Sequence, residues 1–162
     1  MGILCDQQIS KLQIVRDGCS EKISTLNGHK IMSYGLEPHG YTMTLSDESA
    51  PRYGTLTDLE RRRSFWLEPG ESISLKCNEF LEMPLNVVGF LYPKSSYSRH
   101  GLIFSLAVVD AGFNGYIHFG VFNPTTKAHR FFVNEGILQI VFHRSEEMPL
   151  SQYGGQYQQK YA

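Results

Sequence analysis

Cations and hydroxyl groups are concentrated in one short stretch of this chain. Lys94, Ser95, Ser96 and Arg99 lie within six positions of one another in the segment Tyr92–Leu102. Ammonium, guanidinium and hydroxyl groups at this spacing are suited to holding the oxygens of a polyphosphate. The stretch therefore predicts a polyanion site.

A single carboxylate follows this stretch closely. Asp110 comes eight residues after Leu102 and opens the glycine-punctuated turn Asp110–Gly115. A carboxylate near a phosphate site is unfavourable unless it activates water or holds a metal ion. An Asp that only caps a turn before Ala-Gly looks the same in sequence. Asp110 is thus a candidate general base, with turn capping as the alternative.

The C-terminal stretch Ser151–Ala162 differs from the rest of the chain. It contains three tyrosines and two glycines and has no apolar periodicity. A frayed terminus fits this composition. So does a mobile flap whose rings, Tyr153 and Tyr157 in particular, cover a ligand. We therefore expect one domain over residues 1–150, followed by a flexible tail over residues 151–162.

Short strands must position these residues. From Phe65 onward the chain consists of short segments that are rich in β-branched or aromatic residues and mostly bounded by Gly, Pro or Asn. Such spacing predicts an antiparallel sandwich or barrel that protects its edges by closure or by a second layer. The predicted strands are Phe65–Leu67, Ser72–Cys77, Val87–Tyr92, Ile103–Val109, Tyr116–Phe122, Arg130–Val133 and Ile137–Phe142.

The N-terminal part is less regular. Asp6–Leu12 predicts a short helix with Asp6 as its N-cap, and Tyr41–Leu45 alternates like a strand. Val15–His39 is rich in Gly, Ser, His and Asn and is predicted to be irregular. Ser46–Arg63 is polar, and its charged end at Glu60–Arg63 is best explained as a solvated loop.

Composition narrows the class of protein. The 162 residues carry a formal net charge of -1, which provides no overall field for nucleic acid. No apolar run approaches the length of a membrane span. We therefore expect neither nucleic acid nor a membrane as a partner. The three cysteines form no CxxC pair and Asp6 comes too early for a secretory signal, which predicts reduced thiols in a cytoplasmic protein.

Several segments together resemble the dCTP deaminase and trimeric dUTPase superfamily, in the order in which that family carries its motifs. The chain is similar to it over nearly its whole length. The segments that carry the resemblance are Ile3–Ile9, Gly40–Leu45, Lys94–Leu102, Asp110–Gly115, Ile137–Gln139 and Tyr153–Gln158.

The resemblance implies an all-β fold with a short N-terminal helix, a distorted β-barrel or jelly-roll that forms a homotrimer. It also implies three deoxynucleotide sites between subunits, with Mg²⁺ carried by the triphosphate. Asp110 would activate the attacking water, and Phe113 would pack under the deoxyribose. The residues implied for the phosphates are Lys94, Ser95, Ser96, Arg99 and Gln139.

Departures from the family pattern decide between activities. The resemblance places the proton-transferring Glu of the deaminases at Gly120, and a strand acid at Thr42. Glycine cannot transfer a proton, so the favoured activity is a dUTPase-like pyrimidine deoxynucleoside triphosphate diphosphohydrolase. The alternatives are a dCTP deaminase and a catalytically inactive member that binds a nucleotide or a protein.

Alternation on the predicted strand puts His118 and Gly120 on one face. The gap at Gly120 is explained by a β-bulge or close packing against a neighbouring subunit. Alternatively, it admits a base with extra substituents, with His118 as a hydrogen-bond partner.

Overall fold

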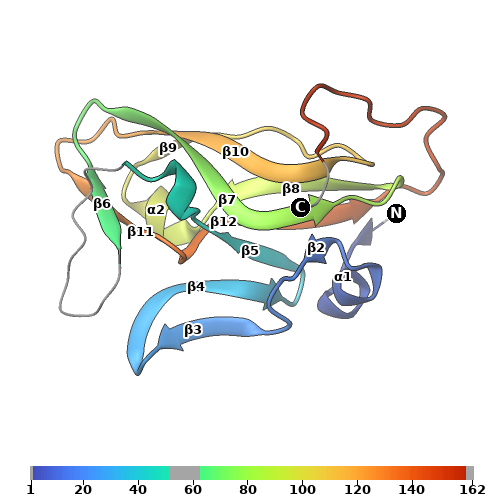
Figure 1. Ribbon diagram of the computed structural model, residues 1–162, viewed down its shortest axis with the longest axis horizontal. Helices are drawn as coiled ribbons and strands as arrows, with labels where there is room; N and C mark the ends of the chain where they lie inside the picture. The colour runs from blue at the N-terminus through green and yellow to red at the C-terminus, as the bar shows by residue number, and fades with distance from the viewer. Residues whose placement is uncertain (1, 52–62, 160–162) are drawn as a thin grey trace.

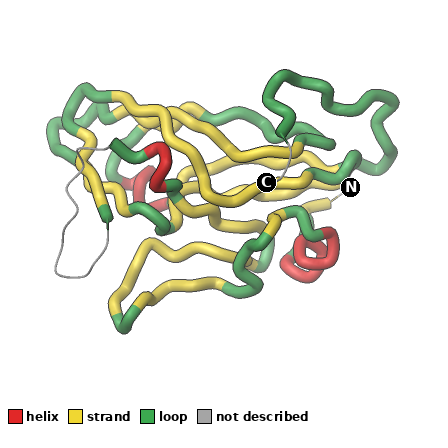
Figure 2. The backbone as a smooth tube through the Cα atoms, in the orientation of Figure 1, coloured by secondary structure: helices red, strands yellow, loops and turns green. Residues whose placement is uncertain are grey.

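The computed structural model describes residues 2–51 and 63–159, and its regular elements are mostly strands (Figure 1). Its helices are short, as Figure 2 shows, and none of the described ones is long and apolar enough to cross a membrane. The helical elements are α1 (Asp6–Leu12), the 3-10 turn η1 (Asp47–Ser49) and α2 (Ser95–Arg99).

Three antiparallel sheets make up the fold. The largest has the order β1-β12-β5-β4-β3, with β8 also paired to β12. Its strands are β1 (Gly2–Ile3), β3 (Lys22–Leu26), β4 (His29–Glu37), β5 (Gly40–Thr44), β8 (Val87–Pro93) and β12 (Gly136–Arg144). The second sheet, ordered β2-β7-β10-β9, contains β2 (Val15–Arg16), β7 (Ser72–Glu82), β9 (Ile103–Ser105) and β10 (Asn114–Phe122). A two-stranded sheet joins β6 (Ser64–Leu67) to β11 (His129–Phe132) at one end of the molecule (Figure 1).

Alternating side chains build the core between the two larger sheets. On β10, Phe119 and Val121 point inward and are buried, whereas His118 and Phe122 point outward. Alternate residues of β12, including Phe142, are fully buried on the other side of the same core. Removing this apolar surface from water is the main stabilising contribution to such a fold. The prediction of a closed or double-layered all-β fold is confirmed.

The predicted helix forms, but its N-cap is Cys5 rather than Asp6. The side-chain oxygen of Gln8 accepts a hydrogen bond of 3.0 Å from the backbone amide of Cys5, so the helix begins one residue early. Asp6 occupies the first turn, where a negative charge is favoured by the helix dipole.

The prediction of irregular structure over Val15–His39 is wrong. This region forms β2 and the hairpin of β3 and β4, which projects from the body in Figure 1. Asn27 and Gly28 make the turn with positive φ values of 50° and 81°. Polar residues on both faces of β3 hide the strand from an alternation test, because β3 is mostly exposed.

Two other segments differ from expectation. The strand predicted over Ile103–Val109 ends at Ser105, and Val109 is joined to Gly89 by a single bridge. Within the predicted polar loop, Asp47–Ser49 forms η1, and Arg63 pairs with the carboxylate of Asp47. Residues 60–62 of the charged cluster lie outside the described residues.

Candidate functional site

An open pocket of about 750 Å³ lies beside the turn that begins at Asp110. It brings together five residues that the sequence nominated: Asp110, Phe113, His118, Tyr153 and Tyr157. The rest of its lining consists of Leu91, Ala107, Val108, Val109, Tyr116, Ile117 and Gln159. The mostly apolar wall with few polar groups is typical of a small-molecule site.

Backbone hydrogen bonds hold the Asp110 turn in place. Val109 exchanges two bonds of 2.8 Å with Gly89 of β8, and the amide of Phe113 donates to the carbonyl of Asp110 at 3.1 Å. Gly112 adopts a φ of 80°, which favours glycine, and its amide donates to Pro84. The carboxylate of Asp110 is consequently presented to solvent from a fixed backbone.

The ring of Phe113 packs against the chain where Gly115 leaves room for it. A Cβ on Gly115 would lie 2.7 Å from the Phe113 ring, so glycine is required for the ring to fold back over the chain. The ring is 8% exposed and forms part of the pocket wall. Phe113 therefore belongs both to the core and to the wall of the pocket.

The C-terminal segment is docked on this turn. The Gln158 side chain donates to the Gly112 carbonyl at 3.0 Å and accepts from the Asn114 amide at 2.9 Å. The Gln159 amide donates to the Asn114 carbonyl at 2.8 Å. These bonds hold Tyr157 at the edge of the pocket, where it is 67% exposed.

Gly120 lies outside this pocket. It lines a neighbouring groove of about 330 Å³, together with Ser105 and Phe122. The register irregularity of β10 falls between Tyr116 and His118, so Gly120 itself is not at a bulge. A Cβ at Gly120 would meet only the Cβ of Ser105, at 3.4 Å, which is an ordinary contact. Within one subunit, close packing does not require glycine here.

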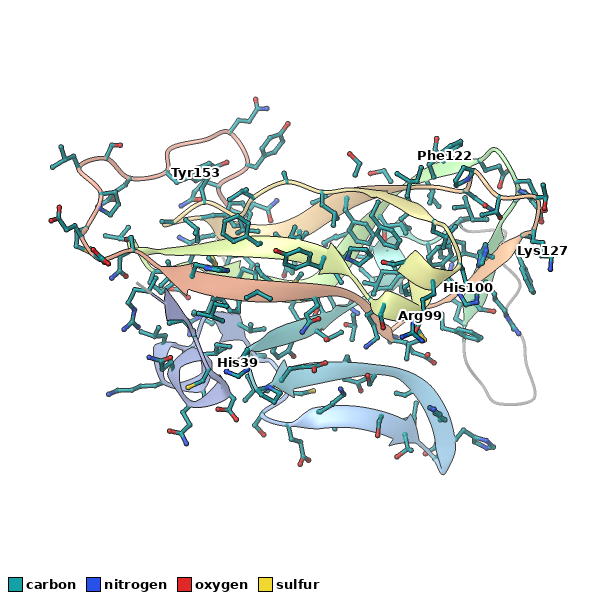
Figure 3. The ribbon with its side chains drawn as sticks, turned by 180° about the vertical axis from the view of Figure 1, so that it is seen from behind. His39, Arg99, His100, Phe122, Lys127 and Tyr153 are labelled. Carbon is teal, nitrogen blue, oxygen red and sulfur yellow. The ribbon has the colours of Figure 1, made fainter. Side chains whose placement is uncertain are left out.

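None of the predicted phosphate ligands lines this pocket. Figure 3 shows Arg99 and Tyr153 in opposite halves of the subunit. Val109 bridges Gly89, and Lys94 is five residues further along the chain, on the order of 16 Å at 3.3 Å per residue. One subunit therefore does not place Asp110 beside Lys94.

Helix α2 carries the hydroxyls and Arg99. Its Tyr97 is buried and stacks on Phe131, with 5.1 Å between ring centroids, which anchors the helix to β11. Ser95 and Arg99 are exposed and Ser96 is half-buried. The helix thus presents its polar side chains at the surface.

Gln139 lies on β12 of the six-stranded sheet, and Lys94 directly follows β8 of the same sheet. The ammonium of Lys94 donates to the hydroxyl of Ser33 at 3.0 Å. Burial lowers the pKa of Lys94, whereas the carboxylate of Glu37 raises it. Gln139 stands opposite Thr42 on β5, so both residues face the same side.

Comparisons with known proteins decide the family. A family model described as dCTP deaminase-like matches residues 25–145. The chain belongs to the dCTP deaminase-like family. Among curated relatives, a dCTP deaminase of Helicobacter pylori (strain G27) is 28% identical over 177 residues, covering 98% of this chain and 94% of the relative.

Solved structures support the fold of this dCTP deaminase-like protein. The 2′-deoxycytidine 5′-triphosphate deaminase of Agrobacterium tumefaciens has a TM-score of 0.61 at 18% identity, over 89% of this chain and 48% of that chain. The chain thus spans about half the length of the Agrobacterium protein. EIAV dUTPase has a TM-score of 0.52 at 13% identity, over 74% of this chain and 87% of that chain. The predicted dUTPase-type fold is confirmed.

The donor set of the pocket bears on the expected Mg²⁺. Among the described residues, no group of three or more His, Cys, Asp or Glu could hold a metal ion. Asp110 is the one acid among the described residues that line the pocket. This arrangement fits Mg²⁺ that arrives on a triphosphate, because Mg²⁺ often binds through one or two carboxylates plus substrate phosphates.

Sequence reasoning missed Lys76 beside this pocket in the dCTP deaminase-like fold. Its ammonium lies 4.2 Å from the ring centroid of Tyr116 and pairs with Glu48. Lys76 stands opposite His118 in the register of β7 and β10. Alternation along Ser72–Cys77 could have shown an outward Lys, but pairing across strands is not visible in a sequence.

Glu79 was also missed. It lies where β7 departs from regular pairing with β10, and both of its carboxylate oxygens accept from the Thr44 amide, at 3.1 and 2.9 Å. Burial raises its pKa to about 7, and the bonds from the Thr44 amide and hydroxyl oppose this shift. No motif marks such a residue, because its burial depends on the bulge.

Proposed function

We propose that this protein is a pyrimidine deoxynucleoside triphosphate diphosphohydrolase that releases the monophosphate and pyrophosphate. The observation that carries the proposal is the acid content of the pocket. Asp110 is the one acid among the described residues that line the pocket, and Gly120, in the neighbouring groove on β10, provides no acid there either. A general base is sufficient for attack by water on a phosphate, whereas deamination of the ring also needs a group that transfers protons there.

In the proposed reaction, Asp110 accepts a proton from a water molecule while the oxygen of that water attacks the α-phosphorus. The bond from this phosphorus to the oxygen that bridges to the β-phosphate breaks, and pyrophosphate leaves. Phe113 packs against the deoxyribose, and His118 contacts the base. Tyr153 and Tyr157 cover the nucleotide by stacking, which contributes about 1–3 kcal/mol per ring in comparable platforms.

A neighbouring subunit is proposed to supply the phosphate contacts of each site. Lys94, Ser95, Ser96, Arg99 and Gln139 would hold the triphosphate, and Mg²⁺ bound to it would neutralise part of its charge. In a homotrimer with three such sites, Lys94 of one subunit can lie beside Asp110 of another, although the two residues are separated within one chain. The free cysteines Cys5, Cys19 and Cys77 support a cytoplasmic location.

Deamination of dCTP is the second candidate. It is favoured by the curated dCTP deaminase of Helicobacter pylori, which is 28% identical over 98% of this chain. Its difficulty is Gly120, which leaves the ring without the expected acid. A catalytically inactive member that binds a nucleotide or a protein is the third candidate, because neither Thr42 nor Gly120 is acidic.

One assay separates the candidates. The protein is incubated with Mg²⁺ and each deoxynucleoside triphosphate, while pyrophosphate and ring absorbance are followed separately. Pyrophosphate without a change in the ring is the expected result for a hydrolase. A change in the ring absorbance would establish deamination instead. Neither signal, combined with thermal stabilisation by a nucleotide, would indicate a binding protein.

A further inference from the structure

Tyr116 lines the candidate pocket, but the proposed reaction assigns it no part. Its half-buried ring meets the ring of Phe80 edge-on, with 5.2 Å between the centroids and 85° between the planes. The ammonium of Lys76 lies over the same ring, 4.2 Å from its centroid. The wall of the pocket therefore contains an aromatic ring that two residues of β7 hold in place.

The irregular pairing of β7 and β10 explains why one ring contacts both of these residues. Tyr116 stands opposite Phe80, and two positions further along β10 His118 stands opposite Lys76. On β7, however, Phe80 and Lys76 are four positions apart. Extra residues in one strand of a pair bend that strand, and residues directly opposite each other point to the same side of a sheet. Lys76 and Phe80 therefore both lie on the side of the sheet to which Tyr116 points.

A second element fixes Lys76. Its backbone amide donates to the Ser49 hydroxyl at 2.9 Å, and its carbonyl accepts from the Ser46 amide at 2.8 Å. These bonds fasten η1 to β7, and Glu48 of η1 accepts a hydrogen bond of 2.5 Å from the Lys76 ammonium. The Lys76 side chain is only 18% exposed, and a partly desolvated cation attracts an aromatic face more strongly than a solvated one. Glu48 thus orients the ammonium, and the ammonium orients the ring.

Tyr116 also has a suitable place for a ligand contact. It lines the pocket together with Phe113, proposed for the deoxyribose, and His118, proposed for the base. Its side chain points to the same side of β10 as that of His118, two positions away. An aromatic ring suits a base rather than a phosphate, because every base has a face that can stack on it.

We propose that Tyr116 contacts the pyrimidine base in this pocket and that Lys76 is a positioning residue, which holds the Tyr116 ring in place without touching the substrate. The base contact rests on the proposed function, which supplies the nucleotide. Because Lys76 acts through the ring, its removal should weaken the binding of a nucleotide but not the binding of a phosphate chain that lacks a base.

The first test needs no nucleotide. Protons above an aromatic face are shifted upfield by its ring current, so the Hε signals of Lys76 should lie upfield of those of ordinary lysines. The signals are assigned in the full-length protein by their loss in Lys76→Arg. We expect Tyr116→Leu to return them to the ordinary position and Tyr116→Phe to leave them shifted. Ordinary Hε shifts for Lys76 in the wild type would overturn the positioning role.

The second test measures calorimetric binding of two probes in the presence of Mg²⁺. One is the α,β-imido analogue of dUTP or dCTP, whichever binds the wild type more tightly, and the other is inorganic tripolyphosphate. Tyr116→Leu should weaken binding of the analogue on the order of tenfold, and Lys76→Met by about threefold. Neither variant should change the binding of tripolyphosphate. An equal loss for both probes in Lys76→Met would show a direct effect on the phosphates and would overturn the positioning role.

A double variant tests whether Lys76 acts through Tyr116. In a Tyr116→Leu background, Lys76→Met should have no further effect, because the ring on which it acts is absent. Lys76→Arg should keep the wild-type affinity, since a guanidinium also binds an aromatic face. Lys11→Met, which removes the same charge from α1, is the matched control and should change nothing. Additive losses in the double variant would show that Lys76 does not act through the ring.

Two outcomes separate the base contact from the proposed function. If the wild type binds and hydrolyses a deoxynucleoside triphosphate and a folded Tyr116→Leu protein does so equally well, the base contact is wrong and the proposed function stands. If the wild type binds no deoxynucleoside triphosphate, both are refuted, even where the Lys76 signals are shifted. If Tyr116→Leu does not fold, Lys76→Met and Lys76→Arg decide, and wild-type affinity of Lys76→Met for the analogue would overturn the inference.

Discussion

The ring of Tyr153 stands edge-on to the ring of Phe113, with 5.8 Å between the centroids and an angle of 71° between the planes. This contact joins the C-terminal segment to the Asp110 turn. A Cβ on Gly155 would lie 2.2 Å from the Tyr153 hydroxyl oxygen, so the tail folds closely over its own tyrosine. The tail therefore has both a structural contact and a place at the pocket.

Substitutions of Tyr153 and Tyr157 are expected to distinguish the structural contact of the tail from its place at the pocket. Tyr153→Ala should lower the free energy of unfolding by about 1 kcal/mol through loss of the aromatic pair. Tyr157→Ala should change it by less than about 0.5 kcal/mol, because this ring is largely exposed. Both variants, and removal of residues 151–162, should lower the turnover rate strongly while the free energy of unfolding changes little. Urea titrations and steady-state kinetics measure the two effects, and a truncated protein with full activity would rule out a flap.

Asp110→Asn is expected to abolish hydrolysis while nucleotide binding persists. The change is nearly isosteric and removes the basicity of the side chain, which corresponds to a loss of about a hundredfold or more in rate. The backbone bonds that hold the turn come from Val109 and Phe113 and are unaffected. Pyrophosphate release and calorimetric binding are the measurements, and wild-type turnover in the variant would make Asp110 a purely structural residue.

Stability should depend on pH through Glu79. Burial raises its pKa from the ordinary 4.5 to about 7, so the fold favours the protonated acid. This contribution is fully present below pH 4.5 and is lost as the pH rises through about 7, by at most about 3 kcal/mol. Urea unfolding at pH 5 and pH 8 should show a smaller decrease in stability for Glu79→Gln than for the wild type. Equal decreases would mean that Glu79 titrates normally in the folded protein.

Two glycines are expected to respond oppositely to a methyl group. In Gly120→Ala the new Cβ meets Ser105 at 3.4 Å, so the fold should be retained. In Gly136→Ala it would lie 2.0 Å from the carbonyl oxygen of Ser33, which forces the backbone apart and should cost about 3 kcal/mol or more. Thermal unfolding compares the two variants.

A pocket role for Gly120 further predicts that Gly120→Ala changes the preference among pyrimidines modified at the C4–C5 edge. An unchanged preference would exclude this role.

The assembly is expected to be a trimer. A base at Asp110 must act next to the phosphates that Lys94 holds. In one chain, however, Val109 bridges Gly89, and Lys94 lies five residues beyond Gly89, on the order of 16 Å along the strand direction. Light scattering should therefore give a mass about three times the 18.4 kDa of the chain. A monomer at micromolar concentration would contradict the proposed sharing of sites.

Local patterns in the sequence determined the strands that build the core. Segments rich in β-branched and aromatic residues and bounded by turn residues were enough to predict strands at Tyr116–Phe122 and Ile137–Phe142, and both form strands of the core. The helix at Asp6–Leu12 was also predicted from the sequence, and it forms over these residues. The β3–β4 hairpin was missed because its first strand is polar, although Asn27-Gly28 is a strong signal for a two-residue hairpin turn.

Strand register and burial, in contrast, were decided only by the tertiary structure. The sequence placed Asp110 and Lys94 in neighbouring motifs, but the Asp110 turn is joined through Val109 to Gly89 near the start of β8, whereas Lys94 follows the end of that strand. It showed a threonine at position 42, but not that Glu37 of the adjacent strand reaches its hydroxyl. The physical reason is that apolar periodicity records which face of a strand is buried, whereas side-chain partners across a sheet depend on pairing between segments distant in sequence.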